Sequence, residues 1–181
     1  MRLLRCAASG PTSYGFGVHS EILDALLDKY RRMRAMREAH ARGGDDAAPT
    51  EMRALATEFP GALREIDRLP MRVIEERIGA LEAAREGGPV PDWAPPLAAF
   101  HGWMRAMLRL KRAMRRSRDL DAARRWLRDH HAGTGFEPSL AQLEAALPAL
   151  LAPHDGRMAR AVLAHLTGGD ARALERRLFD G

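Results

Sequence analysis

Hydrophobic residues recur along most of the chain at spacings of three and four, and this feature most constrains the fold. In the segment that starts at Ser20, they fall at Ile22, Leu26, Tyr30 and Met33. Residues at these spacings share one side of an α-helix, whereas a half-buried strand alternates apolar and polar residues. No such alternation occurs in the sequence. The sequence therefore predicts an all-α fold, a multi-helix bundle with no β-sheet.

Glycine and proline divide the chain into four parts. Residues 1–18 lack periodicity and are predicted to form a loose N-terminal arm, followed by an N-terminal helical part over 19–86. The strongest break is 87–96, where four of ten residues are proline, which favours an extended connector. A C-terminal helical part spans 97–181. At 181 residues, the two helical parts are expected to pack as one domain.

Composition places the chain in the cytoplasm. Cys6 is the only cysteine, so neither an internal disulfide nor a cysteine-based zinc site can form. No apolar run approaches the ~20 residues of a membrane span. Arg5 interrupts the short apolar stretch at the amino terminus, so that stretch does not match a signal peptide. We therefore expect a soluble cytoplasmic protein that does not associate with membranes.

One segment differs from an ordinary surface helix. A single long, basic, amphipathic helix is predicted from about residue 97 to residue 131, with a possible bend near 117–119. Its apolar side alternates spacings of three and four, which suits packing against another helix. We call this side the seam, and it consists of Phe100, Trp103, Met107, Leu110 and Met114. The seam is expected to lie in the core or in an interface with another chain.

The other side of this segment is almost entirely cationic. Residues 101–131 hold ten basic and three acidic side chains, and no acidic residue occurs between Phe100 and Arg118. Like charges four residues apart on a helix repel, which costs a few tenths of a kcal/mol per pair unless an anion neutralises them. We call this side the basic face, and the predicted anion contacts on it are Arg105, Arg109, Lys111, Arg112, Arg115, Arg116, Arg118, Arg124 and Arg125.

The neutralising anion could be a partner molecule or the chain's own acidic helix. Arginine binds phosphate through two parallel hydrogen bonds, and the isoelectric point near 10.3 agrees with an anionic partner. The internal alternative pairs the basic face with Glu75, Glu76 and Glu82, on the outer side of the helix expected near 71–86. Both alternatives stay open at this point.

No residue pattern indicates catalysis, a metal or a cofactor. The seven histidines lack the helical His or Glu pairs three or four residues apart that a metal site needs. The two Gly-x-Gly fragments lack the further residues of a phosphate-binding loop. We therefore predict no catalytic residue, no metal and no cofactor, and a non-enzymatic protein is favoured.

Three functions follow from these observations. The first is a helical binding or regulatory protein that engages an anionic partner, nucleic acid or acidic protein, through residues 105–128. The second is a protein-interaction or oligomerising subunit, with a homo-oligomer as one form, that uses the seam 100–114. The third is an all-α enzyme or small-molecule binder whose site only the fold assembles.

The block 58–70, with prolines at 60 and 70, is expected to set two helices at a fixed angle.

Overall fold

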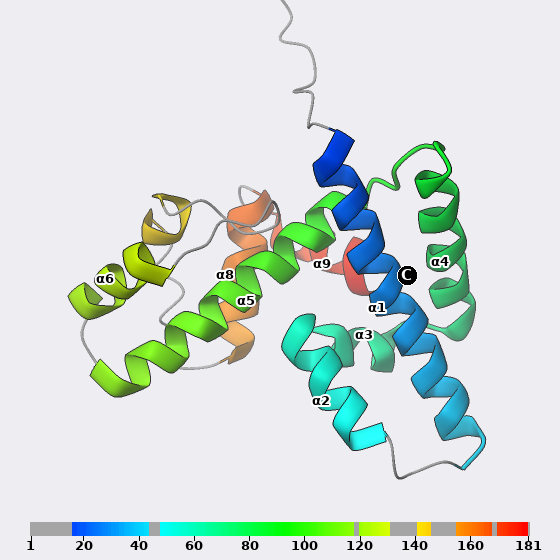
Figure 1. The fold of residues 1–181 in the computed structure, drawn as a ribbon, viewed down its shortest axis with the longest axis horizontal. Coiled ribbons are helices and arrows are strands. Elements are labelled where there is room, and N and C mark those ends of the chain that lie inside the picture. The colour runs from blue at the N-terminus through cyan, green and yellow to red at the C-terminus, as the bar shows by residue number, and fades with distance from the viewer. Residues whose placement is uncertain are drawn as a thin grey trace, which may run out of the picture.

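The structure is a computed structural model, and it describes residues 16–43, 48–117, 120–130, 141–145, 155–167 and 170–180. Within these ranges, all regular secondary structure is α-helix and there is no strand (Figure 1). The predicted all-α bundle is thereby confirmed. None of the described helices is long and apolar enough to cross a membrane.

Four helices form the N-terminal part. They are α1 (Phe16–Ala41), α2 (Ala48–Glu58), α3 (Ala62–Arg68) and α4 (Met71–Arg85). The long α1 packs along α4, and it also contacts α2 and α5 (Figure 1). Because α1 begins at Phe16, the last three residues of the predicted arm are helical, and the rest of that arm lies outside the described residues.

The block 58–70 makes two tight corners around the short helix α3. The first corner contains Gly61, whose φ of 96° is a left-handed conformation that glycine adopts without strain. A Cβ at this position would lie 3.2 Å from the ring of Phe100, so the corner is also closely packed. At the second corner, Pro70 directly precedes α4. The two corners set the direction of α3 between them, and its Glu65 is fully buried.

The connector before α5 is shorter than predicted. Helix α5 (Ala94–Ser117) begins three residues before the predicted start, with Pro95 and Pro96 in its first turn. The first turn of a helix tolerates proline because its amide hydrogens have no partner within the helix. These two prolines therefore lie at the start of the helix, and the non-helical connector ends in a turn at Asp92 and Trp93.

The prediction of one helix over 97–131 is wrong. Helix α5 ends at Ser117, and a separate helix, α6 (Leu120–His130), packs back against α5 (Figure 1). The seam explains the break, because the positions that continue its spacing are Ser117 and Asp121, which are polar. The apolar stripe ends there, and α6 turns so that its own Trp126 packs against the core.

The C-terminal part returns the chain to the N-terminal part. A helical segment covers 141–145 and is followed by α8 (Asp155–Thr167) and α9 (Ala171–Phe179). Asp170 caps α9, since its Oδ1 accepts a hydrogen bond of 3.1 Å from the amide of Ala173. Helix α8 packs on α5 and α9, and α9 reaches α3.

One hydrophobic core joins both sides of the connector. It includes Leu26 of α1, Ile74 of α4, Leu97 of α5 and Leu178 of α9, all at most 1% exposed. The ring of Phe100 packs edge-on against Phe179, with ring centroids 5.2 Å apart. The two helical parts therefore stabilise each other through shared apolar burial.

Candidate functional site

The seam of α5 lies in this chain's own core. Phe100, Trp103, Met107 and Leu110 are all at most 3% exposed, and the side chain of Met114 lies outside the described residues. Of the two expected locations, core or interface, the fold gives the core for these four residues. The oligomerisation alternative needs these four side chains at the surface of the monomer, and in this fold they are buried.

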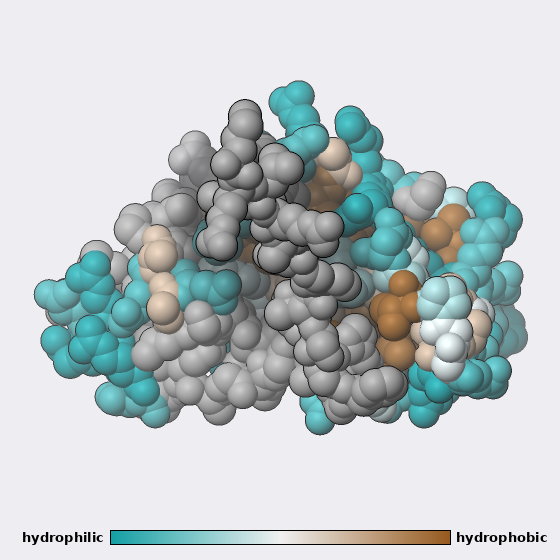
Figure 2. All heavy atoms as spheres, turned by 90° about the horizontal axis from the view of Figure 1, so that it is seen from above, coloured by the Kyte–Doolittle hydropathy of each residue, from teal (hydrophilic) through white to brown (hydrophobic). Residues whose placement is uncertain are grey.

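The basic face of α5 is the side turned toward solvent. Arg109 and Arg112 are exposed, and Lys111 is half-buried. The end of the molecule formed by α5 and α6 is mostly hydrophilic where it is coloured (Figure 2, left). The side chains of Arg115 and Arg116, and Arg118 as a whole, lie outside the described residues.

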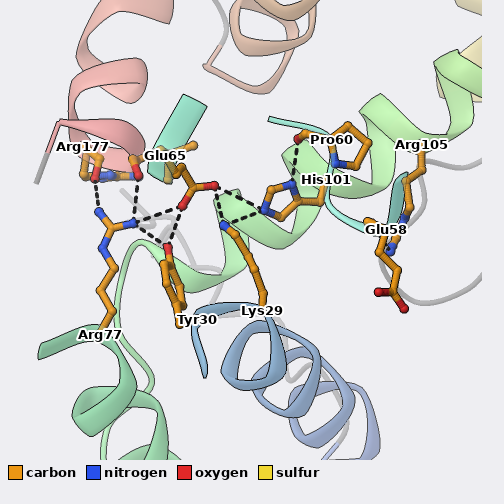
Figure 3. A network of polar contacts seen from close by, with 10 residues as sticks. Lys29, Tyr30, Glu58, Pro60, Glu65, Arg77, His101, Arg105 and Arg177 are labelled. Carbon is orange, nitrogen blue, oxygen red and sulfur yellow. Dashed lines mark hydrogen bonds and ion pairs between the residues drawn. The ribbon is translucent and has the colours of Figure 1, made fainter. Parts of the chain in front are cut away.

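Arg105 has a different environment from the rest of the basic face. It is half-buried, and one guanidinium nitrogen donates a 3.2 Å hydrogen bond to the backbone oxygen of Glu58 (Figure 3). Glu58 is the last residue of α2, whose terminal carbonyl oxygens have no partner within the helix. Arg105 therefore caps α2, and we assign it a structural role as well as a place on the basic face.

On α6, two of the basic side chains have acidic neighbours. Arg124 forms an ion pair of 3.1 Å with Asp121, three residues earlier on the same helix. Arg128 forms an ion pair of 3.3 Å with Glu144 of the segment 141–145. Arg125 is exposed beside them. The basic face thus continues from α5 onto α6, where Asp121 and Glu144 neutralise part of its charge.

Two of the three acidic residues named in the internal alternative have ion-pair partners outside the basic face. Glu82 pairs with Arg31 of α1 at 2.6 Å, and Glu76 pairs with Arg72 of its own helix at 2.6 Å. The packing of α4 against α1 gives Glu82 its basic neighbour, and Glu76 finds its own four residues earlier on α4. Glu75, the third residue, is exposed on α4.

The fold also assembles a buried polar cluster that the sequence analysis missed. We use "buried polar cluster" for five side chains that come together from α1, α3, α4 and α5: Lys29, Tyr30, Glu65, Arg77 and His101 (Figure 3). Each is at most 5% exposed. Burying charged groups is costly unless they are paired and hydrogen-bonded, so the contacts of each one matter.

Glu65 is the anion at the centre of the cluster. Its Oε1 forms an ion pair with the ammonium of Lys29, and its Oε2 accepts a 3.0 Å hydrogen bond from the hydroxyl of Tyr30. The guanidinium of Arg77 lies 3.8 Å from the same Oε2. Two cations and one hydroxyl from two other helices therefore converge on one carboxylate.

The remaining polar atoms also have partners. Arg77 donates to the Tyr30 hydroxyl at 2.6 Å and to the backbone oxygen of Leu178 in α9 at 2.8 Å. Lys29 Nζ lies 3.0 Å from His101 Nε2, and His101 Nδ1 lies 3.1 Å from the backbone oxygen of Pro60. Because a lysine ammonium and a carbonyl oxygen have opposite hydrogen-bonding roles, His101 accepts at Nε2 and donates at Nδ1.

Burial controls the ionisation of the cluster. It lowers the pKa of Lys29 to about 8, although the Glu65 carboxylate opposes this shift. Burial, and after it the Lys29 cation, lowers the pKa of His101 well below its usual value. Burial, and after it the Glu65 anion, raises the pKa of Tyr30 well above its usual value. At neutral pH, His101 and Tyr30 are therefore neutral and Lys29 is mostly protonated.

The cluster joins four helices, and its Lys29, Glu65 and His101 side has no room for a substrate. Lys29 and Glu65 are fully buried, and the hollow beside His101 is only about 30 Å³, which is room for roughly one water molecule. A perturbed pKa at a buried group is a common mark of catalysis, but structural ion-pair networks produce it as well. With its donors and acceptors occupied by one another, the buried polar cluster fits the structural role.

A sequence signal for the cluster does exist. Each charged member occupies a position at helical spacing from buried apolar residues: Lys29 follows Leu26 by three, Glu65 follows Ala62 by three, and Arg77 follows Ile74 by three. His101 likewise follows Leu97 by four. Polar residues on the apolar side of a helix indicate buried pairing, but the spacing within each helix does not identify the partners.

The lowered pKa of His101 predicts loss of stability in mild acid. In the unfolded chain His101 takes up a proton near its ordinary pKa of 6.5, whereas in the folded protein Lys29 at 3.0 Å, nearby Arg105 and burial oppose this. The unfolded state then binds more protons, so below about pH 6.5 the free energy of unfolding falls by up to about 1.4 kcal/mol per pH unit for this one group. Urea denaturation at several pH values measures this fall in the free energy of unfolding.

The variant His101→Gln is expected to have a flatter dependence on pH than the wild type over this range. Glutamine can accept from Lys29 and donate to Pro60, but it does not titrate. His40→Gln is the matched control, because His40 is exposed on α1. If His101→Gln kept the full pH dependence of the wild type, the acid sensitivity would come from other groups.

Comparison with protein families, characterised proteins and solved structures finds no match to this chain. In the part of the chain that the structure describes, no three His, Cys, Asp or Glu side chains gather in a way that could hold a metal ion. The function must therefore be argued from the geometry of the basic face and its surroundings.

Proposed function

We propose that this protein is a non-enzymatic helical module that binds an anionic partner, with nucleic acid as the first candidate, through the basic face of α5 and α6. The observation that supports this most is the division of α5 into two sides. Its apolar side is buried in the core, and its 24 residues include no acidic side chain. Among the described side chains, the side of α5 that reaches solvent carries the basic residues Arg105, Arg109, Lys111 and Arg112.

The chemistry of the exposed residues favours a phosphate backbone. Arginine presents a planar fork of donors that matches the oxygens of a phosphate group, and most protein–nucleic acid hydrogen bonds go to phosphate and sugar. Arg109, Arg112 and Arg125 are exposed on the two adjacent helices of this face. Two of the three acidic residues of α4 that could have competed, Glu82 and Glu76, are paired with Arg31 and Arg72. These features support a surface that attracts polyanions.

The proposal is tested with a triple variant, Arg109→Gln/Arg112→Gln/Arg125→Gln. Arg105 is left in place because it caps α2. We expect the wild type to bind duplex DNA or RNA, measured by fluorescence anisotropy at about 50 mM salt, where phosphate contacts are strongest. The triple variant is expected to lose most of this affinity while it keeps the helical circular dichroism spectrum, because glutamine preserves helix propensity.

A second triple variant serves as the matched control. Arg53→Gln/Arg172→Gln/Arg176→Gln removes the same number of charges from exposed positions on α2 and α9. Both triple variants lower the net charge of +5 by the same amount. Any difference in affinity between them therefore shows which part of the surface binds the nucleic acid. Equal loss of affinity in both would mean that binding follows net charge alone, and the basic face would then not be the site.

A further inference from the structure

A second cationic feature lies away from the basic face. A hollow of about 480 Å³ opens between α4, Trp93 and α9, and three of the side chains that line it are arginines, Arg72, Arg77 and Arg177. Sites for small molecules are commonly hollows of roughly 300–1,000 Å³ with a few polar groups that fix the ligand. This hollow shares no residue with α5 or α6, so it is independent of the proposed nucleic-acid surface.

The inner wall of the hollow is rigid. Arg77 is held by the Tyr30 hydroxyl at 2.6 Å and by the Leu178 backbone oxygen at 2.8 Å, and Figure 3 shows its guanidinium directed at α9. The same guanidinium lies over the ring of Trp93, 4.8 Å from the centroid. Trp93 in turn packs edge-on against Tyr30, with centroids 5.8 Å apart. An aromatic ring and a fixed cation on the inner wall are thus already in position before a ligand binds.

The outer edge of the hollow carries two exposed cations. The side chain of Arg72 is 74% exposed and pairs with Glu76 at 2.6 Å, while that of Arg177 is 50% exposed and lies 3.9 Å from Asp92. Exposed ion pairs of this kind contribute about 0–1 kcal/mol, so an incoming anion can replace the carboxylates at small cost. One arginine comes from α4 and the other from α9, which places them on two sides of the opening.

We propose that this hollow binds a small aromatic anion, a planar ring that bears a phosphate or carboxylate group. Arg72 and Arg177 bind the anionic group through charge-assisted hydrogen bonds, which are about twice as strong as neutral ones. The planar ring packs against the indole of Trp93, since aromatic pairs gain energy beyond the area they bury. Arg77, whose guanidinium lies over the indole, adds a fixed positive charge to the inner wall.

Adenosine monophosphate is a suitable probe because it combines both chemical features. Its binding is followed by the indole Nε1–H resonance of Trp93 in the ¹⁵N-labelled protein, which is assigned with Trp93→Phe. We expect a saturable shift of this resonance at millimolar probe or below. Adenosine and inorganic phosphate, each with one of the two features, are expected to bind at least about tenfold more weakly.

Variants locate the binding. The variant Arg72→Gln/Arg177→Gln is expected to bind adenosine monophosphate at least about tenfold more weakly than the wild type. The control Arg53→Gln/Arg172→Gln is expected to keep the wild-type affinity. Arg109→Gln/Arg112→Gln/Arg125→Gln is also expected to leave it unchanged, which separates this site from the basic face. No saturable shift up to about 10 mM probe, or equal affinity in the Arg72/Arg177 variant, would overturn the proposal. Phosphate binding as tightly as the nucleotide would overturn the role of Trp93.

Discussion

Glu65→Gln is expected to lower the free energy of unfolding by about 3–5 kcal/mol, the cost of removing one partner from a buried ion pair. The carboxylate of Glu65 is fully buried between Lys29 and Arg77. Glutamine keeps the size of the side chain but leaves two cations in the core without an anion. Urea denaturation at pH 7 measures the loss, and the protein is expected to remain helical below the transition.

Two further variants test that explanation. Asp67→Asn makes the same chemical change on the same helix at an exposed position, and it is expected to alter stability by no more than about 0.5 kcal/mol. Lys29→Met combined with Glu65→Leu removes the pair together, and its cost is expected to be well below the sum of the single changes. A Glu65→Gln variant as stable as Asp67→Asn would show that the carboxylate does not neutralise the buried cations.

Leu110→Ala is expected to destabilise the protein by about 2–5 kcal/mol, because the residue is fully buried in the seam of α5 and the substitution leaves a cavity. The loss should appear as a lower midpoint of urea denaturation with little change in its slope. Met52→Ala is the control, since Met52 is a large hydrophobic residue that is 38% exposed. A Leu110→Ala variant no less stable than this control would place the seam at the surface.

The sequence was a good guide wherever one helix face alone determines the structure. The spacing of Phe100, Trp103, Met107 and Leu110 predicts one buried side, and all four are buried. The helix boundaries were less predictable, because they depend on how neighbouring segments pack. Pro95 and Pro96 can end one element or begin the next, and only the packing of α5 shows that they begin it. The turn from α5 into α6 likewise depends on where Trp126 can be buried.

The buried polar cluster could not be predicted for a related reason. Its members are separated by as many as 72 residues along the chain, as Lys29 and His101 are, so their pairing depends on the tertiary fold. The same holds for the hollow lined by Arg72, Trp93 and Arg177, which come from three different segments. The basic face was visible in the sequence because all of its residues lie within one continuous stretch, 105–125.

The salt dependence of nucleic-acid binding tests the central claim most directly. Each phosphate contact on duplex DNA contributes about −0.9 to the slope of log K against log salt, so three contacts by Arg109, Arg112 and Arg125 give a slope near −2.7. The affinity of the wild type is then expected to fall about 40-fold between 50 and 200 mM salt. The triple variant on the basic face should lose most of this slope, and the control triple variant should keep it. A wild-type protein that binds neither DNA nor RNA at about 50 mM salt, or a slope that is unchanged in the basic-face variant, would contradict the account.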